Sequence, residues 1–185
     1  MPLNIRESAD ADIGAITAIY AHAVRHGSAS FETEPPDEAE MASRRVAILA
    51  RGMPYVVAEM PGAGVVGYAY VGPYRARPAY RFSVENSIYV APDRQGAGIG
   101  RLLLPALIER TEAQGYRLMI AVIGDSANRA SIRLHELCGF APVGTLPAVG
   151  WKHGRWLDTV LMSRPLGPGP DEPPPDMQCS PDRAQ

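Results

Sequence analysis

The sequence predicts a single α/β domain organised around a mixed β-sheet. Three observations point to this class. The chain has 185 residues, which is a usual length for one domain. Hydrophobic residues make up 46% and charged residues 21% of the sequence, as in ordinary globular proteins. Segments with strand patterns alternate with segments of helical periodicity, in the order β-α-α-β-β-β-α-β-α-β-β.

The first half of the chain is expected to hold a strand, two helices and a β-hairpin. The first helix places Ile13, Ile16 and Tyr20 on one face, with Asp10 as its N-cap and Gly27 at its end. Proline and glycine between the last two strands favour a turn. In chain order, the elements are a strand at Leu3–Glu7, helices at about 10–25 and Pro36–Arg51, and hairpin strands at Tyr55–Met60 and Val65–Val71.

The second half is expected to alternate strands with helices. Pro105 lies inside the first of these helices and should remove one hydrogen bond and bend it. The apolar face of the last helix is expected to consist of Ala130, Leu134, Leu137 and Cys138. The elements are a strand at Arg81–Val90, a helix at Gly98–Gln114, a strand at Arg117–Ile123, a helix at Ser126–Cys138, and strands at Pro142–Val149 and Leu157–Arg164.

The composition changes near residue 165, which divides the chain into a folded domain, 1–164, and a tail, 165–185. The tail holds 7 of the 18 prolines, and its four acidic residues against one arginine give a net charge of −3. Its few large apolar side chains cannot offset the entropy lost on ordering. We therefore expect a disordered or polyproline-like tail.

Charge and cysteine content exclude several classes of protein. The net charge of −2 argues against a nucleic-acid-binding surface. The two cysteines, Cys138 and Cys179, are too few for a disulfide framework or a metal cluster. The first residues do not resemble a secretory signal, and the apolar runs are shorter than the ~20 residues of a membrane span. These features predict a soluble, cytoplasmic protein.

The strongest local signal is a glycine-rich loop between a predicted strand and a predicted helix. It reads Arg94-Gln95-Gly96-Ala97-Gly98-Ile99-Gly100, and it favours an anion such as a pyrophosphate at the helix start. A tight strand-to-helix turn without a ligand is the plainer interpretation. A dinucleotide-binding fingerprint is a further alternative, because Asp125 follows the next strand, although Leu103 replaces the third glycine. The Gly-Lys-Ser/Thr sequence of a Walker loop is absent.

Two motifs together resemble the GNAT acetyltransferase superfamily. Gln95-x-x-Gly98-x-Gly100 matches its pyrophosphate loop. About thirty residues later, Asn128-x-x-Ser131-x-x-x-His135 before Gly139-Phe140 resembles its second coenzyme A element, in which alanine and tyrosine usually replace the serine and histidine. The resemblance covers residues 2–163. It implies a GNAT fold with a mixed, mostly antiparallel central sheet flanked by helices, and acetyl-CoA as cosubstrate.

Several further segments narrow this resemblance to the phosphinothricin N-acetyltransferases, whose close relatives acetylate methionine sulfoximine. The family resemblance implies an acetyl-CoA-dependent N-acetyltransferase for a small amino-acid-like amine, acting as a homodimer. The matching segments are Ser30-Phe31-Glu32-Thr33-Glu34-Pro35, residues 72–80, Val84-Glu85-Asn86-Ser87-Ile88-Tyr89-Val90, residues 121–124, 133–136 and Gly150-Trp151-Lys152-His153-Gly154.

The resemblance also implies how acetyl-CoA is bound. The backbone of Ile88–Val90 would hold the pantetheine arm, with the Val90 N–H donating to the thioester carbonyl. Asn128 would contact the same arm, although its residue type also suits a helix cap. The implied coenzyme-binding residues are Ile88, Tyr89, Val90, Gln95, Gly96, Ala97, Gly98, Ile99, Gly100, Arg101, Asn128 and Ser131.

Two residues are the candidates for catalysis. Glu85 lies inside a predicted strand, where an acid is costly unless it is paired or functional, and the family places it as general base for the substrate ammonium. An edge-strand surface acid is the alternative. His135 could protonate the leaving thiolate or assist deprotonation of the amine, or it could be a packing histidine. Cys138 is expected in the core, so we expect direct transfer in a ternary complex.

The acceptor is expected to be a small amino acid with a second anionic or polar head. Arg75, Arg77 and Arg81 precede the catalytic strand, and their guanidinium groups suit carboxylate or phosphinate, although loop arginines are often merely solvated. Residues 150–156 are interpreted as a loop at the pocket rim or dimer interface. No metal is expected, because His22, His26 and His153 lack ligand spacing. The implied substrate-binding residues are Phe31, Thr33, Arg75, Arg77, Tyr80, Asn86 and Ser87, with Glu34 as a further wall residue.

Three alternatives to this function remain open at the level of sequence. The same chemistry could serve another small amine or a protein N-terminus, although Arg75 and Arg77 argue against polyamines, which favour an acidic pocket. A coenzyme A sensor without catalysis is disfavoured by Glu85 and His135. A dinucleotide-binding enzyme would differ in the coenzyme that it binds.

Overall fold

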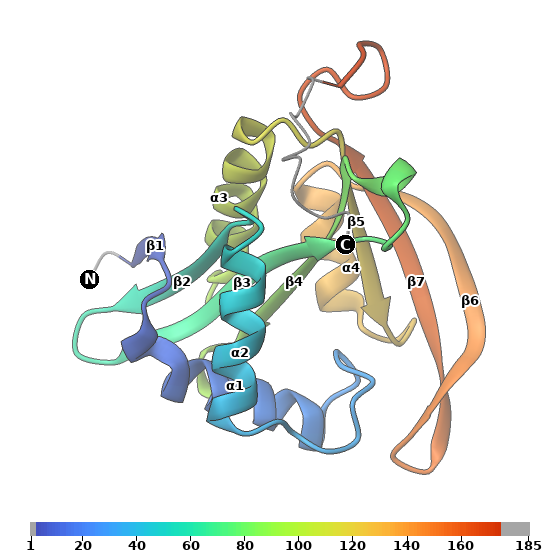
Figure 1. Ribbon diagram of the computed structural model, residues 1–185. Coiled ribbons are helices and arrows are strands. Elements are labelled where there is room, and N and C mark those ends of the chain that lie inside the picture. Colours follow the sequence, from blue (N-terminus) through green and yellow to red (C-terminus); the bar gives the residue numbers. More distant parts are fainter. Residues whose placement is uncertain (1–2, 175–185) are drawn as a thin grey trace, which may run out of the picture.

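A computed structural model describes residues 3–174 of the chain. Within this range, seven strands form one sheet in the order β1-β2-β3-β4-β5-β7-β6 (Figure 1). The strands are β1 (Asn4–Glu7), β2 (Tyr55–Met60), β3 (Gly64–Pro73), β4 (Ser83–Val90), β5 (Leu118–Gly124), β6 (Ala141–Lys152) and β7 (Arg155–Pro165). The helices are α1 (Ile13–His26), α2 (Glu38–Leu49), α3 (Gly100–Ala113) and α4 (Arg129–Leu137).

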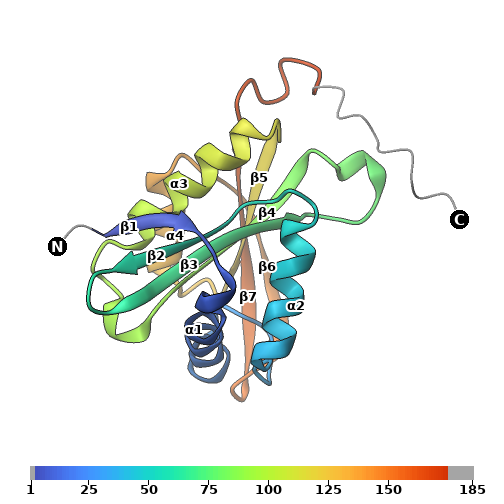
Figure 2. The same cartoon turned by 60° about the vertical axis from the view of Figure 1, so that its left-hand side comes forward.

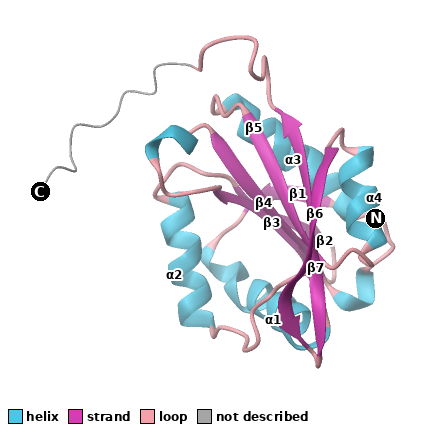
Figure 3. Ribbon diagram, turned by 90° about the vertical axis from the view of Figure 1, so that its right-hand side faces the viewer, coloured by secondary structure: helices cyan, strands magenta, loops and turns pink. Residues whose placement is uncertain are grey.

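The two faces of the sheet carry different helices because strand residues alternate between them. Val56 and Ala58 of β2 pack toward α3, whereas Tyr55 and Val57 pack toward α1 and α2. Figures 2 and 3 show the strands between these two groups of helices, with α4 on the α3 side. The predicted fold class and element order are therefore confirmed.

The sheet is open in its centre. The central strands β4 and β5 are the parallel neighbours of the described sheet, and they pair only from Ser83 with Leu118 to Asn86 with Ala121. Beyond these pairs, β4 continues to Val90 beside β3 alone, and β5 continues to Gly124 beside β7 alone. The two strands diverge in Figure 1, so the sheet has a wedge-shaped opening at its middle.

The start of the first helix differs from the prediction. Asp10 is not its N-cap, because a short 3₁₀ turn at Asp10–Asp12 precedes α1. The Asp12 carboxylate accepts the backbone N–H of Ala9 at 2.7 Å and pairs with Arg6, while Asp10 pairs with Arg45. The cap therefore lies two residues later than the helical pattern suggested.

The apolar face of α4 also differs from the prediction. Leu137 is 49% exposed and Ala130 is exposed, whereas Ile132, Leu134 and Cys138 pack against the core. The helix begins at Arg129 rather than at Ser126, so its orientation could not be inferred from the assumed start. With the buried His135 they form one face, because Ile132, His135 and Cys138 are three apart and Leu134 and Cys138 are four apart.

The segment 150–156 is not a long loop. Strands β6 and β7 extend through it, and only His153 and Gly154 form the turn. Both have positive φ, 52° and 73°, as in the two-residue hairpin turns that match strand twist. Trp151 and Trp156 face each other across the hairpin, with ring centroids 5.3 Å apart.

The end of the described chain continues past the last strand. Leu166 is fully buried, and its N–H donates to the Arg117 carbonyl at 2.9 Å. The rest of the predicted tail from residue 175 on lies outside the described residues, as does Cys179. Over residues 3–174, no helix combines the length and apolar character required to cross a membrane.

Candidate active site

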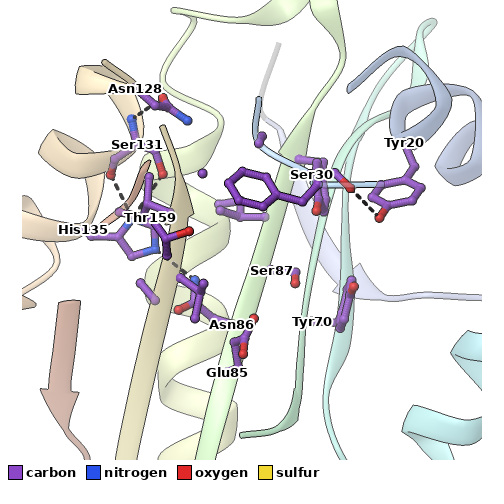
Figure 4. Close-up of a pocket in the computed structure, with 18 of the residues that line it drawn as sticks. Tyr20, Ser30, Tyr70, Glu85, Asn86, Ser87, Asn128, Ser131, His135 and Thr159 are labelled. Atoms are coloured by element: carbon purple, nitrogen blue, oxygen red, sulfur yellow. Dashed lines mark hydrogen bonds between the residues drawn. The ribbon is translucent and has the colours of Figure 1, made fainter. Parts of the chain in front are cut away.

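A cavity of about 470 Å³ lies where β4 and β5 separate. One wall comes from β4 and β5, a second from the start of α4, and a third from the segment between α1 and α2 (Figure 4). The lining residues are Tyr20, Ala29, Ser30, Phe31, Glu32, Tyr70, Glu85, Asn86, Ser87, Ile88, Tyr89, Ala121, Val122, Ile123, Gly124, Asn128, Ser131, His135 and Thr159.

Glu85 lies in the middle of β4, between Gly72 of β3 and Ile120 of β5, and its side chain lines the cavity. Burial raises the pKa of its carboxyl group, and the positive charge of Arg75 partly opposes this rise. A carboxylate with a raised pKa is a better proton acceptor near neutral pH than an exposed one. This group can therefore act as a general base at the opening of the sheet.

His135 is 2% exposed and is held at both ring nitrogens. Nδ1 lies 2.8 Å from the Ser131 carbonyl, and Nε2 lies 2.9 Å from the amide nitrogen of Asn86. A carbonyl only accepts, so Nδ1 carries the proton and Nε2 accepts from Asn86. Burial lowers the pKa of the His135 ring, and the edge of Phe140 packs against it with centroids 4.9 Å apart. His135 is thus a neutral residue in the wall.

The same arrangement leaves one polar atom of the wall without a partner. Asn86 is 6% exposed, and its Oδ1 is buried with no hydrogen-bond partner among the described residues. The amide cannot turn to satisfy this oxygen, because His135 Nε2 would then lose its donor. Asn86 therefore has an unsatisfied acceptor, Oδ1, and it lines the cavity at the point where the strands divide.

The start of α4 forms the wall opposite the segment between α1 and α2. Asn128 caps the helix, with its Oδ1 accepting the Ser131 N–H at 3.2 Å. This is the capping role that its residue type allowed. The cap uses only the oxygen, so the amide nitrogen of Asn128 is not engaged by it and can donate to a ligand in the cavity.

Several lining residues had no assigned role in the sequence analysis. The Tyr20 hydroxyl bonds Ser30 Oγ at 2.9 Å and donates to Glu32 Oε1 at 3.0 Å, and Arg44 donates to the same oxygen at 2.6 Å. Burial raises the pKa of Tyr20 to about 12, so its hydroxyl remains protonated. Tyr70 and Thr159 complete this group of unassigned residues. Tyr20 carried no signal beyond its place on an amphipathic helix.

The predicted coenzyme-binding residues fall into two groups. Ile88, Tyr89, Asn128 and Ser131 line the cavity, while Val90 lies at the end of β4. The glycine loop follows and leads into α3, and it holds the remaining residues Gln95, Gly96, Ala97, Gly98, Ile99, Gly100 and Arg101.

The geometry of the loop explains two of its glycines. Gly96 and Gly98 have φ of 79° and 81°, a left-handed conformation that favours glycine. Ile99 is 3% exposed and packs in the core, so only its backbone is available to a ligand. Gln95 lines a second hollow of about 360 Å³ together with Asn128. The loop therefore presents mainly backbone groups.

The predicted substrate-binding residues are more dispersed. Phe31, Asn86 and Ser87 line the cavity. The structure does not bring the others to its wall. Thr33 and Glu34 are exposed and follow the wall segment between α1 and α2. The residues Arg75, Arg77, Tyr80 and Arg81 lie on the exposed segment between β3 and β4.

Arg75 is nevertheless close to the catalytic candidate. Its guanidinium lies over the Tyr74 ring, 4.5 Å from the centroid, and its charge lowers the pKa of Glu85. Of the predicted arginine cluster, Arg75 thus influences Glu85 without lining the cavity. Within residues 3–174, no group of three or more metal-ligating side chains is placed to hold a metal ion.

Comparison with known proteins gives a consistent result. Residues 16–140 match the Acetyltransferase (GNAT) family. The chain is 54% identical over 165 residues to a phosphinothricin N-acetyltransferase of Alcaligenes faecalis, covering 89% of this chain and 83% of that protein. It is 42% identical over 168 residues to an L-methionine sulfoximine/L-methionine sulfone acetyltransferase of Pseudomonas paraeruginosa, covering 91% and 97%.

A solved structure has the same arrangement of elements. It is the crystal structure of a GNAT superfamily phosphinothricin acetyltransferase from Sinorhizobium meliloti in complex with acetyl-CoA. The TM-score is 0.92 at 48% sequence identity, over 96% of this chain and 95% of that one. The coenzyme in that protein is therefore bound on a fold that this chain shares.

Proposed function

Because this chain belongs to the GNAT family of acetyltransferases, and within it to the phosphinothricin and methionine sulfoximine N-acetyltransferases, we propose that its acceptor is a small amino acid of that shape. The chain is an N-acetyltransferase that uses acetyl-CoA. One observation carries the proposed site: β4 and β5 separate beside Glu85, so a proton acceptor and an unpaired strand edge face one cavity.

The opening of the sheet suits a coenzyme with a long arm and a pyrophosphate. From Ser87 to Val90, β4 has no partner on its β5 side, and its backbone can bond the pantetheine amides. The N–H groups of Gly96, Gly98 and Ile99 have no acceptor within residues 3–174, and they lie in the loop that leads into α3, with Ile99 as its N-cap. Free N–H groups at a helix start favour an anion, which supports placing the pyrophosphate there.

The chemistry assigned to this chain's residues begins with Glu85. Bound acetyl-CoA supplies an acetyl group on a thioester. The Glu85 carboxylate accepts a proton from the acceptor ammonium, directly or through a water molecule, and frees the nitrogen lone pair for attack. The Val90 N–H donates to the carbonyl oxygen as it gains negative charge. As the C–N bond forms and the C–S bond breaks, the nitrogen loses its second proton and the thiolate gains one.

Two residues have roles that follow from their burial. Cys138 packs against the core, and burial raises the pKa of its thiol, so it is a poor nucleophile and supports direct transfer. The two ring nitrogens of His135 are occupied by Ser131 and Asn86. This pattern favours a positioning role for His135, acting through Asn86, over the proton donor that the sequence suggested.

The charges around the cavity suit an amino-acid acceptor. Glu85 lines it and attracts an ammonium group, whereas Glu32, which also lines it, is already paired with Arg44. Arg75, at its border near Glu85, can attract the carboxylate or phosphinate at the other end of the acceptor. A diamine has no anionic group to pair with Arg75. An uncharged amine would pair with neither Glu85 nor Arg75.

The function is tested by measuring thiol release from acetyl-CoA with a panel of acceptors. The panel holds L-phosphinothricin, L-methionine sulfoximine, L-methionine sulfone, glutamate, a polyamine and an N-terminal peptide. Saturation at low concentration with the first two or three supports the proposal. Release only with the polyamine or the peptide, or none with any acceptor while acetyl-CoA still binds, contradicts the proposed acceptor.

The exposed face of the β6–β7 hairpin supports a second proposal, a homodimer. Strand β6 is an edge of the sheet, and five large apolar residues of the hairpin are exposed. An apolar group of this size at a sheet edge is unusual for a monomer and suits a second copy of the chain. These residues are Val143 (64%), Leu146 (48%), Val149 (51%), Trp151 (58%) and Trp156 (60%).

A further inference from the structure

Lys152 is the sole lysine of the sequence and lies at the end of β6, beside the hairpin turn. Lysine at such a place is ordinarily exposed, yet Lys152 is only 4% exposed. Its ammonium group donates to the Gly27 carbonyl at 2.9 Å and to the Ser30 carbonyl at 2.6 Å. Burial lowers its pKa, and the nearby Glu32 carboxylate opposes this effect. The ammonium group is therefore hydrogen-bonded within the fold rather than exposed to solvent.

The two carbonyls belong to the segment that forms one wall of the cavity. Residues 27–32 leave the end of α1 and supply Ser30, Phe31 and Glu32 to the lining. The Lys152 ammonium binds carbonyls three residues apart, so one group fixes both the start and the middle of this segment. Hydrogen bonds from a charged donor are stronger than those between neutral groups.

The Phe31 ring of the same segment packs against two glycines, Gly124 and Gly150, which together form the Phe31 seat. A Cβ atom on Gly150 of β6 would lie 2.5 Å from the Phe31 ring. A Cβ atom on Gly124 of β5 would lie 3.0 Å from the ring and 2.0 Å from the Ser28 carbonyl oxygen. The 2.5 Å distance at Gly150 and the 2.0 Å distance at Gly124 are too short for real contacts, so the absence of side chains at these positions lets the segment lie against β5 and β6.

We propose that Lys152 is a positioning residue that holds residues 27–32 against β5 and β6 and thereby sets the shape of the acceptor pocket. The proposal rests on the proposed function, because it assumes that this wall contacts the acceptor. Acetyl-CoA should depend less than the acceptor on this clamp of Lys152 on Gly27 and Ser30, since the β4 edge and the glycine loop make no hydrogen bond to Lys152. Loss of the Lys152 hydrogen bonds should therefore change the KM for the acceptor more than the Kd for acetyl-CoA.

The first test compares Lys152→Met with Arg51→Met, which removes an exposed cation at the end of α2. We expect the KM for L-phosphinothricin or L-methionine sulfoximine to rise about 10-fold in K152M, with kcat and the Kd for acetyl-CoA within about 2-fold, given typical charge-assisted bonds. R51M should match the parent protein. An unchanged acceptor KM, or an equal rise for both substrates, would overturn the proposal.

The second test works on the seat of Phe31 and leaves the buried charge in place. Gly150→Ala adds one methyl group against the ring, whereas Gly144→Ala, on the same strand, adds it where nothing lies within 4 Å. We expect G150A to raise the acceptor KM and G144A to leave it unchanged. Equal KM values for these two variants would contradict the role of the seat, even if K152M does not fold.

A measurement without turnover separates the clamp from the proposed function. Amide hydrogen exchange of peptides that cover residues 27–32 should be faster in K152M than in the parent protein and R51M. Faster exchange with no acetylation of any acceptor would retain the clamp and reject the acceptor. Unchanged exchange would reject the clamp whatever the activity.

Discussion

The amide nitrogen of Asn86 lies 2.9 Å from Nε2 of His135, and this contact joins the dividing point of the sheet to α4. Because Nδ1 is bonded to a carbonyl, the contact requires a neutral ring. A protonated ring would have two donors, and the Asn86 amide would have to turn to meet the second one. The contact is therefore made in one protonation state of His135, the neutral one.

Stability should depend on pH through His135. Its folded-state pKa lies below the ordinary value of about 6.5, so below that pH the unfolded chain binds a proton that the folded chain resists. The free energy of unfolding should thus fall as the pH drops from about 6.5 through the folded pKa. Urea unfolding of the parent protein and His135→Gln between pH 7.5 and 5 checks this. A difference between them that does not change with pH would contradict it.

Glu85→Gln should lower kcat by about 10²–10⁴-fold, the usual contribution of a general base. The Kd for acetyl-CoA, measured by calorimetry, should stay within about 2-fold because the amide has nearly the same shape. Glu109→Gln, an exposed residue of α3, is the control. Unchanged turnover in E85Q at saturating substrates would remove Glu85 from the mechanism.

Arg75→Gln should move the acidic limb of the kcat/KM profile to higher pH. Arg75 lowers the pKa of Glu85, so its removal raises that pKa, and the base is then protonated at a higher pH. Rates measured from pH 5 to 9 give the position of the limb, with Arg133→Gln as a control on an exposed face of α4. A limb that stays in place or moves down would contradict the predicted coupling.

Gly98→Ala should weaken acetyl-CoA binding more than it affects the fold. Gly98 has a φ of 81°, and a side chain there costs about 1–2 kcal/mol if the loop keeps its conformation. We expect the loop to relax and the Kd for acetyl-CoA to rise about 10-fold. Calorimetry of G98A beside Gly144→Ala measures this. Equal affinities would show that the loop backbone does not hold the coenzyme.

Trp156→Arg should shift the proposed homodimer toward the monomer. Trp156 is 60% exposed, so a charge there costs the single chain little, but it would be buried between two copies. Sedimentation velocity over a range of concentrations reports the association state. A monomer in the parent protein, or a dimer that W156R leaves intact, would contradict an interface on this hairpin.

Much of the fold could be predicted because the signals are local. Gly27, Gly52 and Gly139 end helices, and alternation of apolar residues marks the strands. Asp10 was misplaced as a cap because a 3₁₀ turn is invisible to helical periodicity. The turn at His153 and Gly154 was missed because the segment 150–156, rich in aromatic and basic residues, was interpreted as a loop.

The candidate site was predictable only where residues that are adjacent in the sequence also lie together in the folded site. Glu85, Asn86 and Ser87 are consecutive and all line the cavity. The clamp of Lys152 on Gly27 joins residues 125 positions apart, and no local pattern reports such a contact. Arg77 and Arg81 were placed near the acceptor because of their charge and their position before the catalytic strand. The direction of side chains on an exposed segment depends on the whole fold, which these local features do not report.

The early separation of β4 and β5 also has an energetic consequence. A closed sheet would pair every inner backbone group, whereas here the ladder between these strands stops at Asn86 and Ala121. Beyond these residues β4 and β5 make no hydrogen bonds to each other, so a ligand that enters between them does not have to break any. In the proposed complex the pantetheine arm of acetyl-CoA would occupy this edge, so coenzyme binding should raise the free energy of unfolding.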